Sequence, residues 1–380
     1  MKKTTVIVLF IIVLLIPSLG QANDIQGSGN YDDILEPVMA RAKIIDMLYE
    51  NEGDYGFVHQ VFVAEIVAGP FKGETVLVEN AFSGNPAMDM IIHPGDKVIL
   101  AMEVIDNQIA AAYPQDFYRE FHIYLLIGIF ILVLLAVGQL KGLKAIFTLG
   151  ITVFLIAKVM LPAMLKGYDP LMLAIIISVV VTTITLVIIG GLTPKTFAAI
   201  LGTTGGVLVA AFISLWVGHA AKLTGLSGQE AQMLMYIADS VGFNFKNLLF
   251  AGIIIGALGA VMDVSMSIAS AMDEIKLNNP SISKARLIQS GMNVGKDIMG
   301  TMTNTLILAY TGTSIPLLLL FLAYQQSYLK IVNMDFIATE FVRALSGSIG
   351  LVFAIPITAL VSAALTRASS SRKKSKDISA

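Results

Sequence analysis

Residues 252–275, GIIIGALGAVMDVSMSIASAMDEI, and residues 284–312, KARLIQSGMNVGKDIMGTMTNTLILAYTG, decide how this chain folds. Both stretches are apolar enough to cross a bilayer, yet Asp263, Asp297 and Asn304 lie within them. Ionisable groups at membrane depth are costly, so they usually face a bundle interior or a water-filled path. The sequence therefore predicts two polar-lined spans framed by the remaining apolar segments.

Each of the two spans carries its polar residues three or four positions apart, which places them on one face of a helix. The candidate residues of a transport path are Asp263, Ser267, Asp297, Thr301 and Asn304. Small residues four positions apart predict a close helix crossing at Gly252, Gly256 and Ala260. The alternative role for the hydroxyls and the amide is packing between helices without transport. A lone carboxylate suits that role less well, because it is expensive to bury.

The composition is that of a multispan membrane protein. Of 380 residues, 56% are hydrophobic and 14% are charged, and the mean hydropathy is +0.79, whereas soluble domains are about a quarter charged. The chain has no cysteine, which excludes disulfides and thiolate metal sites. Its four histidines are scattered without ligand spacing, so no metal site is expected. No P-loop, dinucleotide fingerprint or basic aromatic patch is present, so neither a cofactor nor a nucleic-acid partner is expected.

The amino-terminal part has two predicted regions. Residues 1–22 combine two lysines, a short apolar run and an ending of small residues, which indicates a signal peptide; an uncleaved anchor is the alternative. Residues 23–119 are polar and rich in turns, with short strands that predict a small extracytoplasmic β-barrel or sandwich, and five strands would suit an OB-like barrel. The segment from Ala40 to Tyr49 fits either a strand or a helix. No group of residues in this domain has catalytic spacing.

Residues 120–368 form the predicted transmembrane domain, with about seven apolar spans of bilayer length. These spans are Phe121–Gly138, Leu143–Leu165, Leu171–Leu192, Thr196–Gly218, Asn247–Met272, Met299–Ala323 and Ala344–Thr366.

Loop charges orient these spans. With the barrel outside, the connections assigned to the cytoplasm and the basic tail, residues 369–380, hold most of the Lys and Arg residues. This asymmetry follows the positive-inside rule and predicts a cytoplasmic carboxyl terminus. Glu340 and Arg343, one turn apart near the outer start of the last span, are expected to form an exposed pair of little energetic value.

Three stretches resemble one family closely: GALGAVMDVSMSIASAMDEI from Gly256, GKDIMGTMTNTLILAYTG from Gly295 and SGSIGLVFAIPITAL from Ser346. On these residues the chain resembles the YibE/F family of bacterial membrane proteins, and the AGPFKGE turn of the amino-terminal domain fits as well. The resemblance implies a multispan protein of the bacterial plasma membrane. It brings no catalytic or ligand residues to transfer to this chain.

Two functions from different classes remain open. The first is movement of a small cation, a proton or another small solute along the fifth and sixth spans, where Asp263 and Asn304 lie at similar depth, about 12 Å from the inner helix end. The second is a non-transporting scaffold in the lipid bilayer, whose barrel binds an envelope protein. An intramembrane aspartyl protease built on Asp263 and Asp297 ranks third, because helix rise separates the two carboxylates; no enzyme activity is therefore expected. The sequence leaves the solute and the oligomeric state open.

Overall fold

The structure is a computed structural model that describes residues 37–52, 58–238 and 242–376; the predicted signal segment lies outside them. Two compact units divide the chain, one ending at Leu134 and the other beginning at Leu135. The division falls within helix α2 (Glu120–Phe154), beyond the predicted domain boundary at residue 119.

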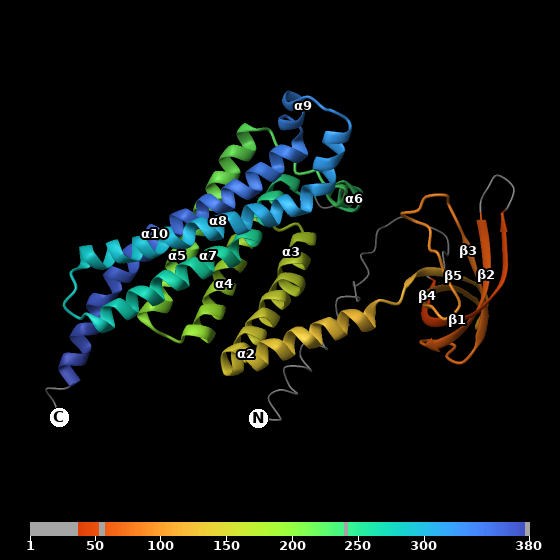
Figure 1. Ribbon diagram of the computed structural model, residues 1–380, viewed down its shortest axis with the longest axis horizontal. Coiled ribbons are helices and arrows are strands. Elements are labelled where there is room, and N and C mark those ends of the chain that lie inside the picture. Colours follow the sequence, from red (N-terminus) through yellow and green to blue (C-terminus); the bar gives the residue numbers. More distant parts are fainter. Residues whose placement is uncertain (1–36, 53–57, 239–241, 377–380) are drawn as a thin grey trace. The chain divides into compact units, whose positions relative to one another are not determined.

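The first unit contains five antiparallel strands that form a nearly closed barrel (Figure 1). The strands are β1 (Val38–Glu52), β2 (Val58–Ala68), β3 (Thr75–Ala81), β4 (Lys97–Ile105) and β5 (Gln108–Phe117). They are hydrogen-bonded in the order β3-β2-β1-β4-β5, and the two outer strands, β3 and β5, lie beside each other. This arrangement confirms the predicted OB-like barrel. The segment from Ala40 to Tyr49, which the sequence left undecided, is strand.

Alternation of side chains along the strands fills the barrel. Ile44, Phe62, Ala64 and Ile66 are fully buried, whereas the alternate residues of β2, such as Val63 and Glu65, are more exposed. Strand β1 is long and irregular in register, which lets its first half pair with β4 while most of its length pairs with β2.

Ion pairs tie the end of the barrel to the first helix. Arg41 of β1 contacts Glu120 at 3.0 Å, and Arg119 pairs with Asp116. The hydrogen bond from the Arg119 side chain, followed by that from the Phe117 backbone N–H, holds the pKa of Asp116 below its ordinary value.

The second unit is a helical bundle, to which the second half of α2 belongs. Its further elements are η2 (Leu155–Met160, a π-helix), α3 (Leu161–Leu165), α4 (Pro170–Gly190), α5 (Pro194–Ala220), α6 (Gln229–Ala238), α7 (Phe245–Asn278), α8 (Lys284–Ala323), α9 (Tyr328–Val332) and α10 (Asp335–Lys376). Helix α10 continues into the predicted tail as far as Lys376.

Six helices of the described chain are long and apolar enough to cross a membrane. The first runs through α2, η2 and α3 for 46 residues, more than twice the length that a bilayer core requires. At Gln139 its backbone is not helical, with φ 47° and ψ −124°. The helix therefore contains the first two predicted spans joined at Gln139, which reconciles six long helices with about seven predicted spans.

Local sequence signals explain where the helices begin. Asp169 accepts a hydrogen bond from the backbone N–H of Met172 at 2.8 Å, and Pro170 follows as the first helical residue of α4. Three further helices are capped in the same way: α5 by Thr193, which Pro194 follows, α7 by Asn244 and α8 by Ser283.

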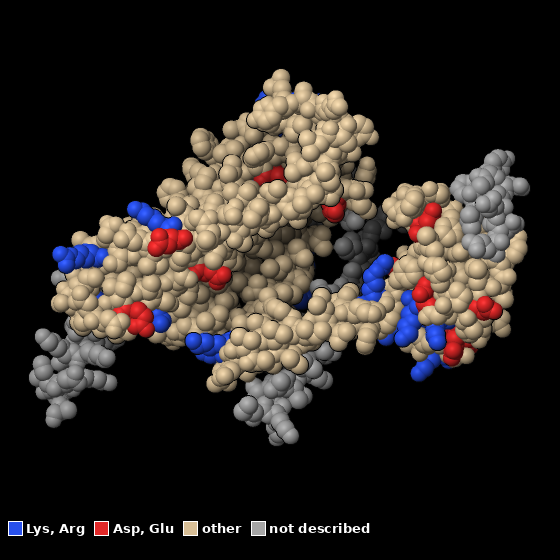
Figure 2. All heavy atoms as spheres, in the orientation of Figure 1, with Lys and Arg blue, Asp and Glu red and all other residues tan. Residues whose placement is uncertain are grey.

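Helix α7 lies at the centre of the bundle and packs against α4, α5, α8 and α10 (Figure 1). Its residues Ile254, Val261, Val264 and Ile268 are fully buried. In the space-filling view the long helices show few charged side chains (Figure 2), as a bilayer environment requires.

Candidate functional site

The predicted polar stripe of α7 lies on the side of this helix that the bundle leaves open. Gly252, Gly259, Asp263 and Ser267 are exposed, whereas the opposite side of α7 is buried against its neighbours. Helical spacing therefore identified residues that share a face, and this face points out of the bundle.

The polar stripe of α8 is exposed as well. Asp297, Thr301 and Asn304 lie on the outer side of α8, away from Gly291 and Gly295, which contact the rest of the bundle. The Thr301 hydroxyl donates to the Ile298 carbonyl at 2.9 Å within its own helix. We call the exposed polar residues of both helices the α7–α8 polar face: Asp263, Ser267, Asp297, Thr301 and Asn304.

Two close contacts set the register between the antiparallel helices α7 and α8. A Cβ on Gly256 of α7 would lie 2.7 Å from the hydroxyl oxygen of Tyr310, and a Cβ on Gly295 of α8 would lie 3.2 Å from Ile268. Counting residues inward from these contacts places Asp263 at the level of residues 300–303, the same depth as Thr301 and close to that of Asn304.

Asp263, Thr301 and Asn304 lie at a similar depth, but their side chains are not bonded to one another in the described part of the chain. No hydrogen bond or ion pair connects Asp263 with Thr301, Asn304 or Asp297 in the part of the chain that the structure describes. The same register puts Asp297 level with Ser267, about one turn from Asp263 along the helix axes. The structure thus brings the candidates to one region without building a closed ligand site from them.

Of the three predicted packing residues, Gly256 contacts a neighbouring helix directly, through Tyr310 of α8. Ala260 is partly buried against the main core. A Cβ on Gly252, by contrast, would meet no heavy atom within 4 Å.

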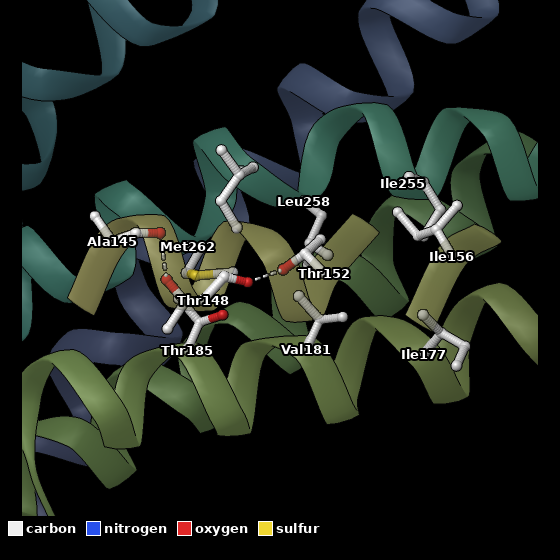
Figure 3. A pocket seen from close by; sticks show the side chains of 12 residues that line it. Ala145, Thr148, Thr152, Ile156, Ile177, Val181, Thr185, Ile255, Leu258 and Met262 are labelled. Carbon is white, nitrogen blue, oxygen red and sulfur yellow. Dashed lines mark hydrogen bonds between the residues drawn. The ribbon is translucent and has the colours of Figure 1, made fainter. Parts of the chain in front are cut away.

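Beside the polar face, residues of α2, η2, α4 and α7 line a cavity of about 330 Å³ that is partly open to the surface (Figure 3). Its walls are mostly aliphatic, with three threonines among them: Thr148 and Thr152 of α2 and Thr185 of α4. The Thr148 hydroxyl donates to the Ala145 carbonyl at 3.0 Å, and that of Thr152 to the Thr148 carbonyl at 2.9 Å. The hydroxyl oxygens remain free to accept hydrogen bonds from a bound molecule.

No sequence pattern predicts this cavity, because a few threonines in apolar spans look like ordinary packing residues. A local signal does exist at its wall: Pro162 follows the π-helix η2, which contributes Ile156 to the lining. Proline cannot donate to the helix ladder, and π-turns inside helices frequently mark functional sites.

Helix α7 connects the cavity with the polar face. Gly259 and Met262 line the cavity, and Asp263 is the next residue, about 40° around the helix from Gly259. A Cβ on Gly259 would meet no heavy atom within 4 Å, so nothing covers α7 at this point. The arrangement offers a carboxylate at the edge of an apolar, hydroxyl-bearing cavity.

Among the described residues, no three His, Cys, Asp or Glu side chains gather closely enough to hold a metal ion.

Comparison with known proteins gives a consistent result for both units. A family model described as YibE/F-like protein matches residues 126–368, and a model described as YibE/F family N-terminal domain matches residues 47–116. No curated protein and no solved structure matches the chain. The two models together cover the barrel and the helical bundle, and the chain therefore belongs to the YibE/F family.

Proposed function

We propose that this protein moves a small cation, a proton or another small solute across the bacterial plasma membrane along α7 and α8, without enzymatic chemistry. The observation that carries the proposal is the position of Asp263. It is exposed on an apolar helix, level with Thr301, at the edge of the cavity between α2, α4 and α7.

Membrane energetics support a wet environment for this residue. A charged side chain that faces hydrocarbon at mid-bilayer costs at least about 2.5 kcal/mol. Asp263 therefore needs water, a bound cation or another polypeptide beside it, or it takes up a proton and becomes neutral. A carboxylate with nearby hydroxyl and amide oxygens suits a hard cation or a proton.

The proposed topology places the barrel outside the cytoplasm and the carboxyl terminus inside. Lys and Arg residues at the helix ends support it: the side that carries Lys141, Lys195 and Lys276 is the more basic. In this orientation α7 runs inward and α8 runs outward.

The experiment is ion flux into liposomes that contain the purified protein, with empty liposomes as the blank. Asp263→Asn keeps the shape of the side chain and removes its charge, so we expect it to insert and fold normally while cation or proton flux is lost. Asp273→Asn is the matched control, since Asp273 lies on the same helix and pairs with Lys195 at 3.8 Å. Full flux in Asp263→Asn would remove this residue from the path.

A scaffold that binds an envelope protein is the second candidate, and the barrel surface favours it. A groove of about 600 Å³ lies between the starts of β3 and β5, lined by residues 74–77 and 107–112. These two strands are not hydrogen-bonded to each other, so their outer backbone edges are available to an extended peptide. A protein that shows no flux and loses an envelope partner when the groove is altered would have this function instead.

A further inference from the structure

The α7–α8 polar face is uncovered in this chain. Of the four helices that pack against α7, α8 is the least enclosed: 17% of its most apolar stretch is buried, against 33% for α4 and 50% for α5 and α10. Asp263, Asp297 and Asn304 are exposed on this face. An amide or a carboxyl group, charged or neutral, loses its hydrogen bonds in contact with hydrocarbon. In a bilayer this face therefore needs a polar surface against it.

The two helices carry opposite charges on their exposed sides. On α7, Asp263 and Glu274 are exposed and lie eleven residues apart, about 20° from each other around the helix. On α8, Lys296 is exposed. Asp263 is level with residues 300–303, so Glu274 is level with residues 289–292, and Lys296 lies between the two carboxylates in depth. Among the described residues, no ion pair joins Lys296 to either of them.

A face with this charge distribution is complementary to itself. A two-fold axis along the bilayer normal keeps every residue at its own depth. When two copies meet face to face about such an axis, α7 of each copy lies opposite α8 of the other. Asp263 then faces Asn304 of the second copy, because these residues lie at a similar depth. The Asn304 amide can donate to a carboxylate, and Lys296 of the second copy lies between Asp263 and Glu274 in depth.

We propose that the α7–α8 polar face binds a second copy of this chain across a two-fold axis, and that Asn304 of each copy completes the site of Asp263 in the other. This inference rests on the proposed transport function and deepens it, since the path then lies between two copies and both line it. The contact also explains why Asp263 and Asn304 lie at a similar depth without a bond between them in one chain.

Cross-linking tests the arrangement, because the chain has no cysteine of its own. Two differently tagged full-length copies, one with Ser267→Cys and one with Asp297→Cys, are produced together and treated in membranes with a short bifunctional maleimide. Ser267 and Asp297 are level with each other on opposing helices, so we expect a linked dimer that carries both tags. Leu201→Cys in place of Asp297→Cys is the control: it exposes a thiol on α5, away from this face, and should give no such dimer.

A charge exchange tests the complementarity. Lys296→Glu places like charges between the copies, and two-fold symmetry repeats each contact, so we expect the dissociation constant to rise roughly tenfold. Adding Glu274→Lys to the same chain restores opposite charges across the interface and should return the constant toward that of the parent. Lys284→Glu is the matched control, because it makes the same change at the start of α8, outside the span, and should leave the constant unchanged. Energy transfer between labelled copies in liposomes, measured on dilution with lipid, gives the constants.

The outcomes separate this inference from the transport function. Flux from copies that stay monomeric and form no linked dimer would overturn the inference and leave the transport function standing. A linked dimer without flux would support the interface and remove the transport function. Linkage of Asp297→Cys to itself, but not to Ser267→Cys, would place α8 against α8 and overturn the arrangement. If Lys296→Glu does not fold, the cross-linking result still decides, since it leaves Lys296 unchanged.

Discussion

The hydroxyl oxygen of Tyr310 on α8 lies 2.7 Å from the position that a Cβ on Gly256 of α7 would occupy. This contact sets the register of the two polar helices at the level of Gly256. Glycine allows the approach because any larger side chain at position 256 would displace the tyrosine.

We therefore expect Gly256→Leu to destabilise the protein by about 1 kcal/mol, the low end of the cost of overpacking, because the end of the Tyr310 side chain can move aside. Gly252→Leu is the matched control: it lies one turn earlier on the same open side, where a Cβ meets nothing within 4 Å. Thermal unfolding in detergent measures both variants. Equal melting temperatures for the two would contradict the register.

The sequence predicted much of this arrangement, and the errors have physical causes. Spacing grouped Asp263 with Ser267 correctly, because helix geometry alone determines which residues share a face. We expected the other helices to shield this face, whereas the packing of α7 against four helices leaves it open, which spacing along one helix cannot show. Position near a helix end suggested exposure for Glu340, but its side chain is only 16% exposed. The cavity depends on how α2, α4 and α7 meet, which no single segment encodes.

The contact between α5 and α10 gives a second prediction. A Cβ on Gly206 of α5 would lie 2.7 Å from the Gly350 carbonyl oxygen and 2.8 Å from the Ala354 Cβ. Neither atom can rotate away, so Gly206→Ala should separate the helices and cost about 1–3 kcal/mol of stability.

Gly312→Ala serves as the control for Gly206→Ala, because the added methyl group has open space in the middle of α8. Alanine is the better helix former by up to about 1 kcal/mol, so this variant should be neutral or more stable. Melting temperatures that shift in opposite directions are the expected result. A stable Gly206→Ala protein would mean that α5 and α10 are farther apart than described.

The topology is testable with single cysteines, since the chain has none of its own. Ser83→Cys in the barrel should react with a membrane-impermeant maleimide on intact cells, whereas Ser371→Cys should react only after the membrane is opened. The physical reason is the distribution of Lys and Arg residues at the helix ends. Reaction of both cysteines from outside would reverse the assignment of the carboxyl terminus, and the cysteine-free parent gives the background.

The cavity beside Asp263 leads to the last prediction, which separates a role in transport from a role in packing. Gly259 lines the cavity and has open space around it, so Gly259→Phe should fill much of the 330 Å³ without displacing neighbours. If solutes pass through this space, flux should fall at least about tenfold while the melting temperature stays the same or rises, since the added ring buries apolar surface.

Gly150→Phe is the matched control, because Gly150 of α2 also has open space but does not line the cavity. Its flux should equal that of the parent. Loss of flux in both variants would indicate a general effect of bulk on the helices, and unchanged flux in Gly259→Phe would exclude the cavity from the path. If flux is unchanged in Gly259→Phe, Asp263 would act from the open face alone. On that face its carboxylate needs water or a second polypeptide beside it. Cross-linking of neighbouring copies would then distinguish these two environments.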